Sequence, residues 1–263
     1  MTRIIRAELL RLVRRRTIMF AAAGAAVFSV VATLTVFSSA RDAAGGPSRR
    51  GGTTLAALGG DGGGTEAFAV GASFVGFFVF VIFIALVATE FSGGTFRALL
   101  LRDPHRLRVI VGKLSGILVV AAAVVAVAAV LVFALSLVVA PSEDVSTSQW
   151  FSLASIGNGL RDYATVLAGV AGWAIFGTTL AVIFRSAPLA LGVGFAWAGP
   201  FENIIVDSWT TGYRVFPGQV MGSLIQGGTT ELGIGAAVLT AAAYTAIAAT
   251  VALFLVSRRD VTT

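Results

Sequence analysis

The chain has 263 residues, of which 57% are hydrophobic and 12% are charged, and its formal net charge is +6. Its mean hydropathy is +0.91. These values exclude a water-soluble globular protein, because too few polar side chains remain to cover a core of this size. The sequence contains no cysteine, which excludes disulfide bonds, thiol catalysis and metal sites with cysteine ligands.

Six apolar segments have the length, or nearly the length, of a transmembrane helix, which needs about 20 apolar residues. They cover residues 17–38, 67–89, 114–139, 163–184, 187–206 and 233–256. We therefore predict a single all-α transmembrane domain over residues 1–263, with an outer loop over residues 207–232. The fifth segment is the least regular, because Glu202 and Asn203 interrupt it. We expect that span to be short, tilted or followed by a re-entrant piece.

The positive charges predict which side of the membrane each loop faces, since short loops rich in Lys and Arg stay in the cytoplasm. With a cytoplasmic N-terminus, most of the 19 Lys and Arg residues fall on the inner side. The outer side then keeps only Arg41, Arg49, Arg50, Arg161 and Arg214. Both termini are therefore expected in the cytoplasm. No aromatic-rich basic platform accompanies these charges, so we expect no nucleic-acid partner.

Residues 1–16 predict an amphipathic helix that lies along the inner membrane surface. Cations alternate there with aliphatic residues at helical spacing, and the arginines would face anionic lipid headgroups. These arginines are Arg3, Arg6, Arg11 and Arg14. A plain topogenic anchor explains the same pattern, and the two interpretations are compatible.

The central stretches of the spans lack the ionisable side chains that ion-coupled carriers usually need. This argues against a secondary transporter, a channel with a charged filter and an intramembrane metalloenzyme or carboxylate protease. His105 has no partner at metal-ligand spacing, so we expect no metal site. Gly112–Lys113 lacks the upstream glycine of a phosphate-binding loop, and the glycine-rich residues 59–64 fit a linker. We therefore expect no enzyme activity or cofactor in this chain, and any ATP hydrolysis would need a separate subunit.

Residues 90–113 form a strongly cationic loop between the second and third spans. Residues 92–94 are expected to end the second span, Thr95 to cap a short helix over residues 96–101, and Asp103–Pro104 to end that helix. Its cations are Arg97, Arg102, Arg106 and Arg108. Such a helix would suit docking of a cytosolic partner, and an ordinary positive-inside loop is the alternative.

The loop resembles the one after the second span in permeases of ATP-binding-cassette (ABC) transporters of the type-2 export class. The matching residues are Glu90, Gly94, Thr95, Arg97, Leu99, Leu100, Arg102, Pro104, Arg106, Gly112 and Lys113. Chain length, the six-span layout and the basic N-terminal helix fit the same class. The chain departs from it at Asp103, where the class more often has a small or neutral residue before the proline.

The resemblance implies a multi-pass permease subunit in a bacterial inner (plasma) membrane, in contact with membrane lipids. It would dimerise with an identical or a different permease and pair with two cytosolic ATPase subunits that bind ATP and Mg. The coupling residues would be Glu90, Gly94, Thr95, Arg97, Arg102 and Arg106. Such a complex exports its cargo by alternating access. The alternative is a non-transporting anchor or sensor that binds another cytosolic partner through the same loop.

In the resembled class the second and fifth spans line the transport path, and short re-entrant helices lie between the fifth and sixth spans. Path residues here would be Phe74, Phe77, Phe78, Phe195 and Trp197, which favour a hydrophobic or amphipathic drug, lipid or peptide. Lipid contact or helix packing is the alternative explanation of these aromatic residues. Small residues of the second span, such as Gly71, Ala72, Ser73 and Gly76, permit close helix approach and would also suit a dimer seam. The candidates for the re-entrant helices are residues 200–206 and 217–225.

Overall fold

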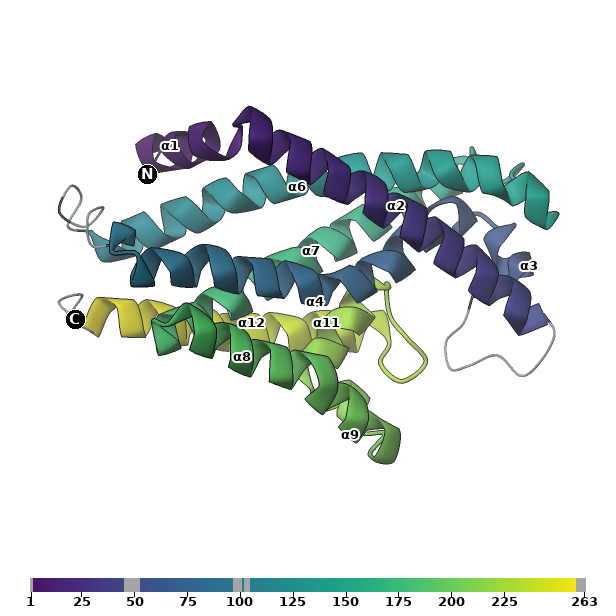
Figure 1. Cartoon of the computed structure of the whole chain (residues 1–263). Coiled ribbons are helices and arrows are strands. Elements are labelled where there is room, and N and C mark those ends of the chain that lie inside the picture. The colour runs from purple at the N-terminus through teal and green to yellow at the C-terminus, as the bar shows by residue number, and fades with distance from the viewer. Residues whose placement is uncertain (1, 45–52, 97–100, 102–104, 259–263) are drawn as a thin grey trace.

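The chain folds into a bundle of helices that run side by side along one long axis (Figure 1). The computed structural model describes residues 2–44, 53–96, 101 and 105–258, and these residues contain no β-strand. Six of the helices are long and apolar enough to cross a membrane. This confirms the predicted all-α architecture with six membrane-length helices, and it identifies the chain as a multi-pass membrane protein.

The six candidate spans are α2, α4, α6, α7, the combination of α8 and α9, and α12. The elements are α1 (Thr2–Leu12), α2 (Arg15–Ala44), α3 (Leu55–Leu58), α4 (Gly63–Ser92), α6 (Arg106–Val139), η1 (Ala140–Glu143), α7 (Leu153–Phe184), α8 (Ala187–Ala196), η2 (Trp197–Phe201), α9 (Glu202–Ser208), α10 (Gly212–Val215), α11 (Pro217–Ile225) and α12 (Ile234–Arg258). Most spans extend past the apolar segments seen in the sequence, because the helix continues into its polar flanks.

The fifth span is a helix with a wide turn in its middle. α8 ends at Ala196, the π-helical segment η2 follows, and α9 completes the span. Pro200 lies inside η2, where its ring and its missing N–H disturb regular α-helical hydrogen bonding. Residues 200–206 lie in η2 and α9, which continue the helical run of α8. Residues 217–225 do form a separate helix, α11.

α7 is the most buried span and lies at the centre of the bundle, in contact with α4, α6, α8, α11 and α12. Glycines allow this close packing. A Cβ atom on Gly177 would lie 3.0 Å from the carbonyl oxygen of Phe80, and one on Gly76 would lie 2.6 Å from Nε1 of Trp173. Close contact of this kind matters because lipid tails provide no hydrophobic force that drives helices together.

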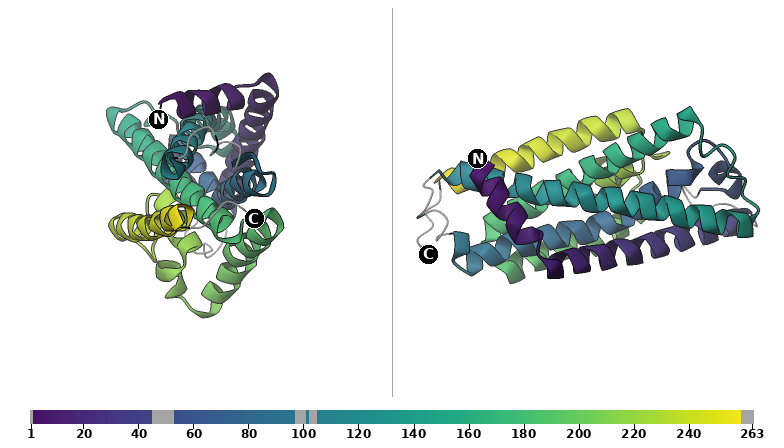
Figure 2. Two further views of the ribbon diagram at one scale, coloured as in Figure 1. Left: turned by 90° about the vertical axis from the view of Figure 1, so that its left-hand side faces the viewer. Right: turned by 90° about the horizontal axis from the view of Figure 1, so that it is seen from above.

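The two ends of the bundle carry different elements. One end holds α1, the C-terminal end of α12, the end of α4 and the start of α6 (Figures 1 and 2). The other end holds α3 and η1, where Trp150 Nε1 donates a 2.8 Å hydrogen bond to the carbonyl oxygen of Leu58. The fold thus brings the N-terminal helix to the same end as the two helices that flank the basic loop.

Candidate functional site

The N-terminal helix α1 runs across the end of the bundle and packs against α6 (Figure 2). Gly112 and Gly116 of α6 stand one helical turn apart and form the floor of this contact. A Cβ atom on Gly112 would lie 3.1 Å from Cγ2 of Ile4, and one on Gly116 would lie 2.9 Å from Cβ of Glu8. Two glycines at this spacing let helix backbones approach closely. This contact fixes α1 to α6 at the end of the bundle.

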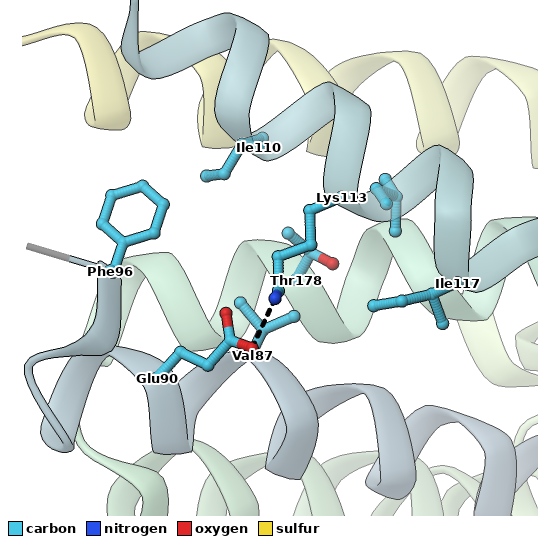
Figure 3. Close-up of a pocket in the computed structure, with 8 residues that line it drawn as sticks. Val87, Glu90, Phe96, Ile110, Lys113, Ile117 and Thr178 are labelled. Carbon is cyan, nitrogen blue, oxygen red and sulfur yellow. Dashed lines mark ion pairs between the residues drawn. The ribbon is translucent and has the colours of Figure 1, made fainter. Parts of the chain in front are cut away.

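Four charged side chains meet where α1, α4 and α6 converge, and we call Glu8, Arg11, Glu90 and Lys113 the ion cluster. Lys113 Nζ lies 2.6 Å from Oε1 of Glu90 (Figure 3) and donates a 3.0 Å hydrogen bond to Oε2 of Glu8. Arg11 Nη1 donates to the same Glu90 oxygen at 2.8 Å and lies 3.5 Å from Oε1 of Glu8. The two cations therefore bridge both carboxylates.

Burial makes this pairing costly to break. The side chains of Glu8, Glu90 and Lys113 are 10%, 8% and 8% exposed, whereas Arg11 is 49% exposed. A buried charge is tolerated only when it is paired and hydrogen-bonded. The hydrogen bond to Glu90 is the main reason that the pKa of Arg11 is raised above its ordinary value, and partial burial acts in the opposite direction. Arg11 is therefore a permanent cation at the open side of the cluster.

The loop also has an apolar anchor at its start. Phe96 is 3% exposed and packs with buried residues of three helices, α6, α7 and α12. Its ring centroid lies 4.6 Å from that of Phe91, at the end of α4. Gly94 makes the turn between them with φ +70°, a left-handed conformation that favours glycine. The Thr95 hydroxyl donates a 3.2 Å hydrogen bond to the carbonyl oxygen of Glu90.

The cavity beside the ion cluster has a volume of only about 10 Å³ (Figure 3). Glu90, Lys113, Phe96, Ile110 and Thr178 are among its lining residues. That volume is close to the room that one water molecule requires. The site therefore suits a mechanical joint between helices and cannot hold a substrate. Among the described residues, no group of acidic or histidine side chains is placed to hold a metal ion.

Several of the predicted coupling residues can be placed in the structure. Glu90, Gly94 and Thr95 lie together at the end of α4, and Arg106 is half-buried at the first turn of α6. Arg97 and Arg102 lie outside the described residues, as does Asp103–Pro104.

Of the predicted interfacial arginines, Arg6 and Arg14 are exposed. Arg11 is half-exposed, and its guanidinium also donates a hydrogen bond to Glu90. The side chain of Arg3 lies outside the described part of the structure. α1 ends at Leu12, and the chain turns over the next two residues before α2 starts at Arg15.

The structure brings some of the predicted path aromatics together. The ring centroid of Phe77 lies 5.6 Å from that of Phe78 and 5.4 Å from that of Phe195, so α4 and α8 share one aromatic surface. Trp197 stacks instead on Phe201 at 4.7 Å. Phe74 is the most exposed of these five aromatic residues, at 81%. These residues form an open face on the second and fifth spans and do not enclose a pocket by themselves.

Glu202 is a buried carboxylate whose burial the sequence did not predict. It is 0% exposed although it lies within the fifth span, and neither oxygen has a hydrogen-bond partner of normal geometry among the described residues. The nearest polar groups are the backbone amides of Gly218 and Gln219, at the first turn of α11, and Trp197. A side chain at position 218 would collide with this carboxylate. Glu202 thus faces the N-terminus of α11, where helix amides favour an anion.

Replacing Glu202 with glutamine should raise the stability of the protein by about 1 kcal/mol or more, because the cost of burying a charge disappears. The loss of attraction to the N-terminus of α11, typically about 0.3–1 kcal/mol, offsets part of this gain. The measurement is the thermal unfolding midpoint of the purified protein at neutral pH. Asp207→Asn, an exposed carboxylate on the same helix, should leave the midpoint unchanged. A lower midpoint for Glu202→Gln than for the wild type would contradict this explanation.

Three residues of the site were not singled out from the sequence. For Glu8 the sequence showed only an acidic residue in a basic helix. Lys113 was noted only as part of the Gly112–Lys113 pair in the loop. Phe96 was placed in the loop helix without a role. The sequence signals that would have found them are the acid on the apolar side of α1, the only lysine of the chain and an aromatic residue in an otherwise basic loop.

A family model described as "Protein of unknown function (DUF2705)" matches residues 56–262. The match includes Glu90, Phe96 and Lys113, whereas Glu8 and Arg11 lie upstream of it. None of the curated proteins compared with the chain matches it. Because the family model covers most of the chain, including five of its six candidate spans, the protein belongs to this family of unknown function.

Proposed function

We propose that this chain is the permease subunit of an ATP-driven export complex that resembles type-2 ABC exporters. The observation that carries the proposal is the ion cluster, in which both flanks of the basic loop, Glu90 and Lys113, are joined to the N-terminal helix. A force applied to the loop by a cytosolic partner would reach α1, α4 and α6 together. A loop that served only to set topology would not require such a joint.

The orientation that we propose places both termini and the basic loop in the cytoplasm of a bacterial cell. The positive-inside rule supports it, because the end of the bundle with α1 and the start of α6 carries most of the positive charge. In this orientation α1 lies at the inner membrane surface. The three exposed arginines that follow it, Arg14, Arg15 and Arg16, lie at the same level as the headgroups.

The contacts of α4 support a transport step in this proposal. ATP-driven closure of two ATPase subunits would displace the loop, and the ion cluster would pass that displacement to α4 and α6. α4 packs on α7 and α8 and shares the aromatic face of Phe77 and Phe195 with α8. If two permease copies meet at this face, tilting α4 would open an apolar path between them. A hydrophobic or amphipathic drug, lipid or peptide fits such a path.

Charge reversal in the loop tests this proposal. Arg97→Glu and Arg102→Glu should abolish most of the ATP hydrolysis that the assembled complex shows, because reversing a charge in the proposed docking segment would weaken its attraction to the ATPase. Arg161→Glu is the matched control, since Arg161 is exposed and is expected on the outer side. Membrane insertion should be unchanged in all three variants. Normal hydrolysis in both loop variants would contradict the coupling role and favour an anchor or sensor.

A further inference from the structure

An apolar groove runs between α1, α2 and α6, next to the bend between α1 and α2. Its volume is about 360 Å³. It is lined by Leu9, Leu12, Val13, Thr17, Ile18, Ala21, Ala22, Ala25, Val119, Val120, Ala123, Val124 and Val127. Thr17 is the only one of these residues with a polar side chain, so the groove suits a hydrocarbon chain.

The shape of the groove comes from its small residues and from the bend between α1 and α2. Alanines of α2 and α6, such as Ala22 and Ala123, leave room where larger side chains would fill the seam. From Val119 to Val127 the groove follows α6 for about 12 Å, at about 1.5 Å per residue. This direction is along the spans, which is also the direction of the acyl chains in a bilayer.

The mouth of the groove is strongly cationic. Arg14, Arg15 and Arg16 stand at the corner between α1 and α2, and all three are exposed. Val13 and Thr17, on either side of them in the sequence, line the groove. Within the part of the chain that the structure describes, none of these three arginines forms an ion pair with an acidic side chain. Three unmatched positive charges thus stand next to an apolar groove.

We propose that this groove is a binding site for one anionic phospholipid, with an acyl chain between α2 and α6 and the phosphate on Arg14, Arg15 and Arg16. Basic clusters next to a transmembrane helix attract anionic headgroups of the inner leaflet. A free phosphate would satisfy the arginines but would leave the groove empty, and a neutral lipid would fill the groove without matching the charge. The apolar groove and the three arginines together therefore favour an anionic phospholipid.

The site has a consequence for the ion cluster. Leu9 and Leu12 line the groove from α1, and Glu8 and Arg11 of the same helix belong to the cluster. A bound lipid would contact Leu9 and Leu12 of α1, the same helix that packs on Gly112 and Gly116 through Ile4 and Glu8. Lipid composition would thereby influence how firmly α1 is held. This inference concerns the lipid site alone and does not depend on the export function.

Native mass spectrometry of the full-length purified protein, titrated with phosphatidylglycerol or with phosphatidylcholine of the same acyl chains, tests the proposal. We expect phosphatidylglycerol to bind at least about tenfold more tightly, since each arginine near a lipid surface contributes to the affinity. The triple variant Arg14→Gln, Arg15→Gln, Arg16→Gln should lose that preference. Ala123→Phe, which fills the groove, should weaken the binding of both lipids.

Two controls change similar residues away from the site. Arg161→Gln removes an exposed charge elsewhere, and Val130→Phe enlarges an exposed side chain of α6 that does not line the groove. Both should bind phosphatidylglycerol as the wild type does. Equal affinity for the two lipids, or an unchanged preference in the triple variant, would overturn the proposal. A protein dimer that Ala123→Phe abolishes would assign the groove to a second copy and would overturn it as well.

Discussion

Replacing Lys113 with methionine should lower the free energy of unfolding by about 3 kcal/mol, because it leaves two buried carboxylates with only one cation between them. Methionine keeps most of the volume of the lysine stem, so the loss reports on charge and not on packing. The structure places Lys113 Nζ within 3.0 Å of both Glu8 and Glu90. The measurement is the thermal unfolding of the purified protein.

A double variant separates charge pairing from other effects of the substitution. In Lys113→Met combined with Glu90→Gln, one carboxylate and one cation remain, Glu8 and Arg11, which lie 3.5 Å apart. Neutral replacement of a buried pair is often close to neutral in stability, so the double variant should regain most of the loss. Arg161→Met, at an exposed position, should behave as the wild type. A double variant less stable than Lys113→Met would refute the charge-pairing account.

Replacing Gly116 with leucine should release α1 from the bundle, because a Cβ atom there would already lie 2.9 Å from Cβ of Glu8. Loss of this contact would separate Glu8 and Arg11 from Lys113 and Glu90. A disulfide reports on docking directly, since the chain has no cysteine of its own. Ile4→Cys and Gly112→Cys would place two Cβ atoms about 3.2 Å apart, slightly closer than the roughly 3.5–4.5 Å usual for a disulfide, so a small shift of α1 would allow the bond.

The crosslink should form readily in the Ile4→Cys, Gly112→Cys protein and should largely disappear when Gly116→Leu is added. Gly24→Leu is the matched control, because nothing lies within 4 Å of a Cβ atom at Gly24. That control should leave the crosslinking yield unchanged. Efficient crosslinking in the presence of Gly116→Leu would mean that α1 docks without the glycine contact.

Much of the fold could be predicted because lipid imposes a simple requirement on the sequence. Each span must be a long apolar helix. Spans at residues 67–89 and 114–139 can therefore be predicted from apolar composition and length alone. The π-helical turn at Pro200 could not be placed, since a proline near the end of an apolar run is compatible with a kink, a stop or a re-entrant helix. The π-helical turn depends on contacts that form only in the folded bundle, such as the approach of Glu202 to Gly218 at the start of α11.

The site was predictable in part for a different reason. Clustered cations mark the loop, and Glu90 stands out as an acid at the end of an apolar run. Its pairing with Arg11 depends on α1 crossing the bundle end, which local patterns do not encode. Gly112 and Gly116 have the spacing of a helix contact, but a sequence does not reveal which helix fills it. The long-range contacts between short charged segments could therefore not be predicted from the sequence alone.

The most direct test of the proposed function is to extract this chain from its native membrane in mild detergent, identify the proteins that co-purify, and measure ATP hydrolysis. We predict a cytosolic ATPase recovered in equal amounts with the chain, with hydrolysis that Arg97→Glu abolishes. Reproducible recovery of the chain alone in lipid, or with a partner that hydrolyses no nucleotide, would contradict the export proposal and support a membrane anchor or sensor.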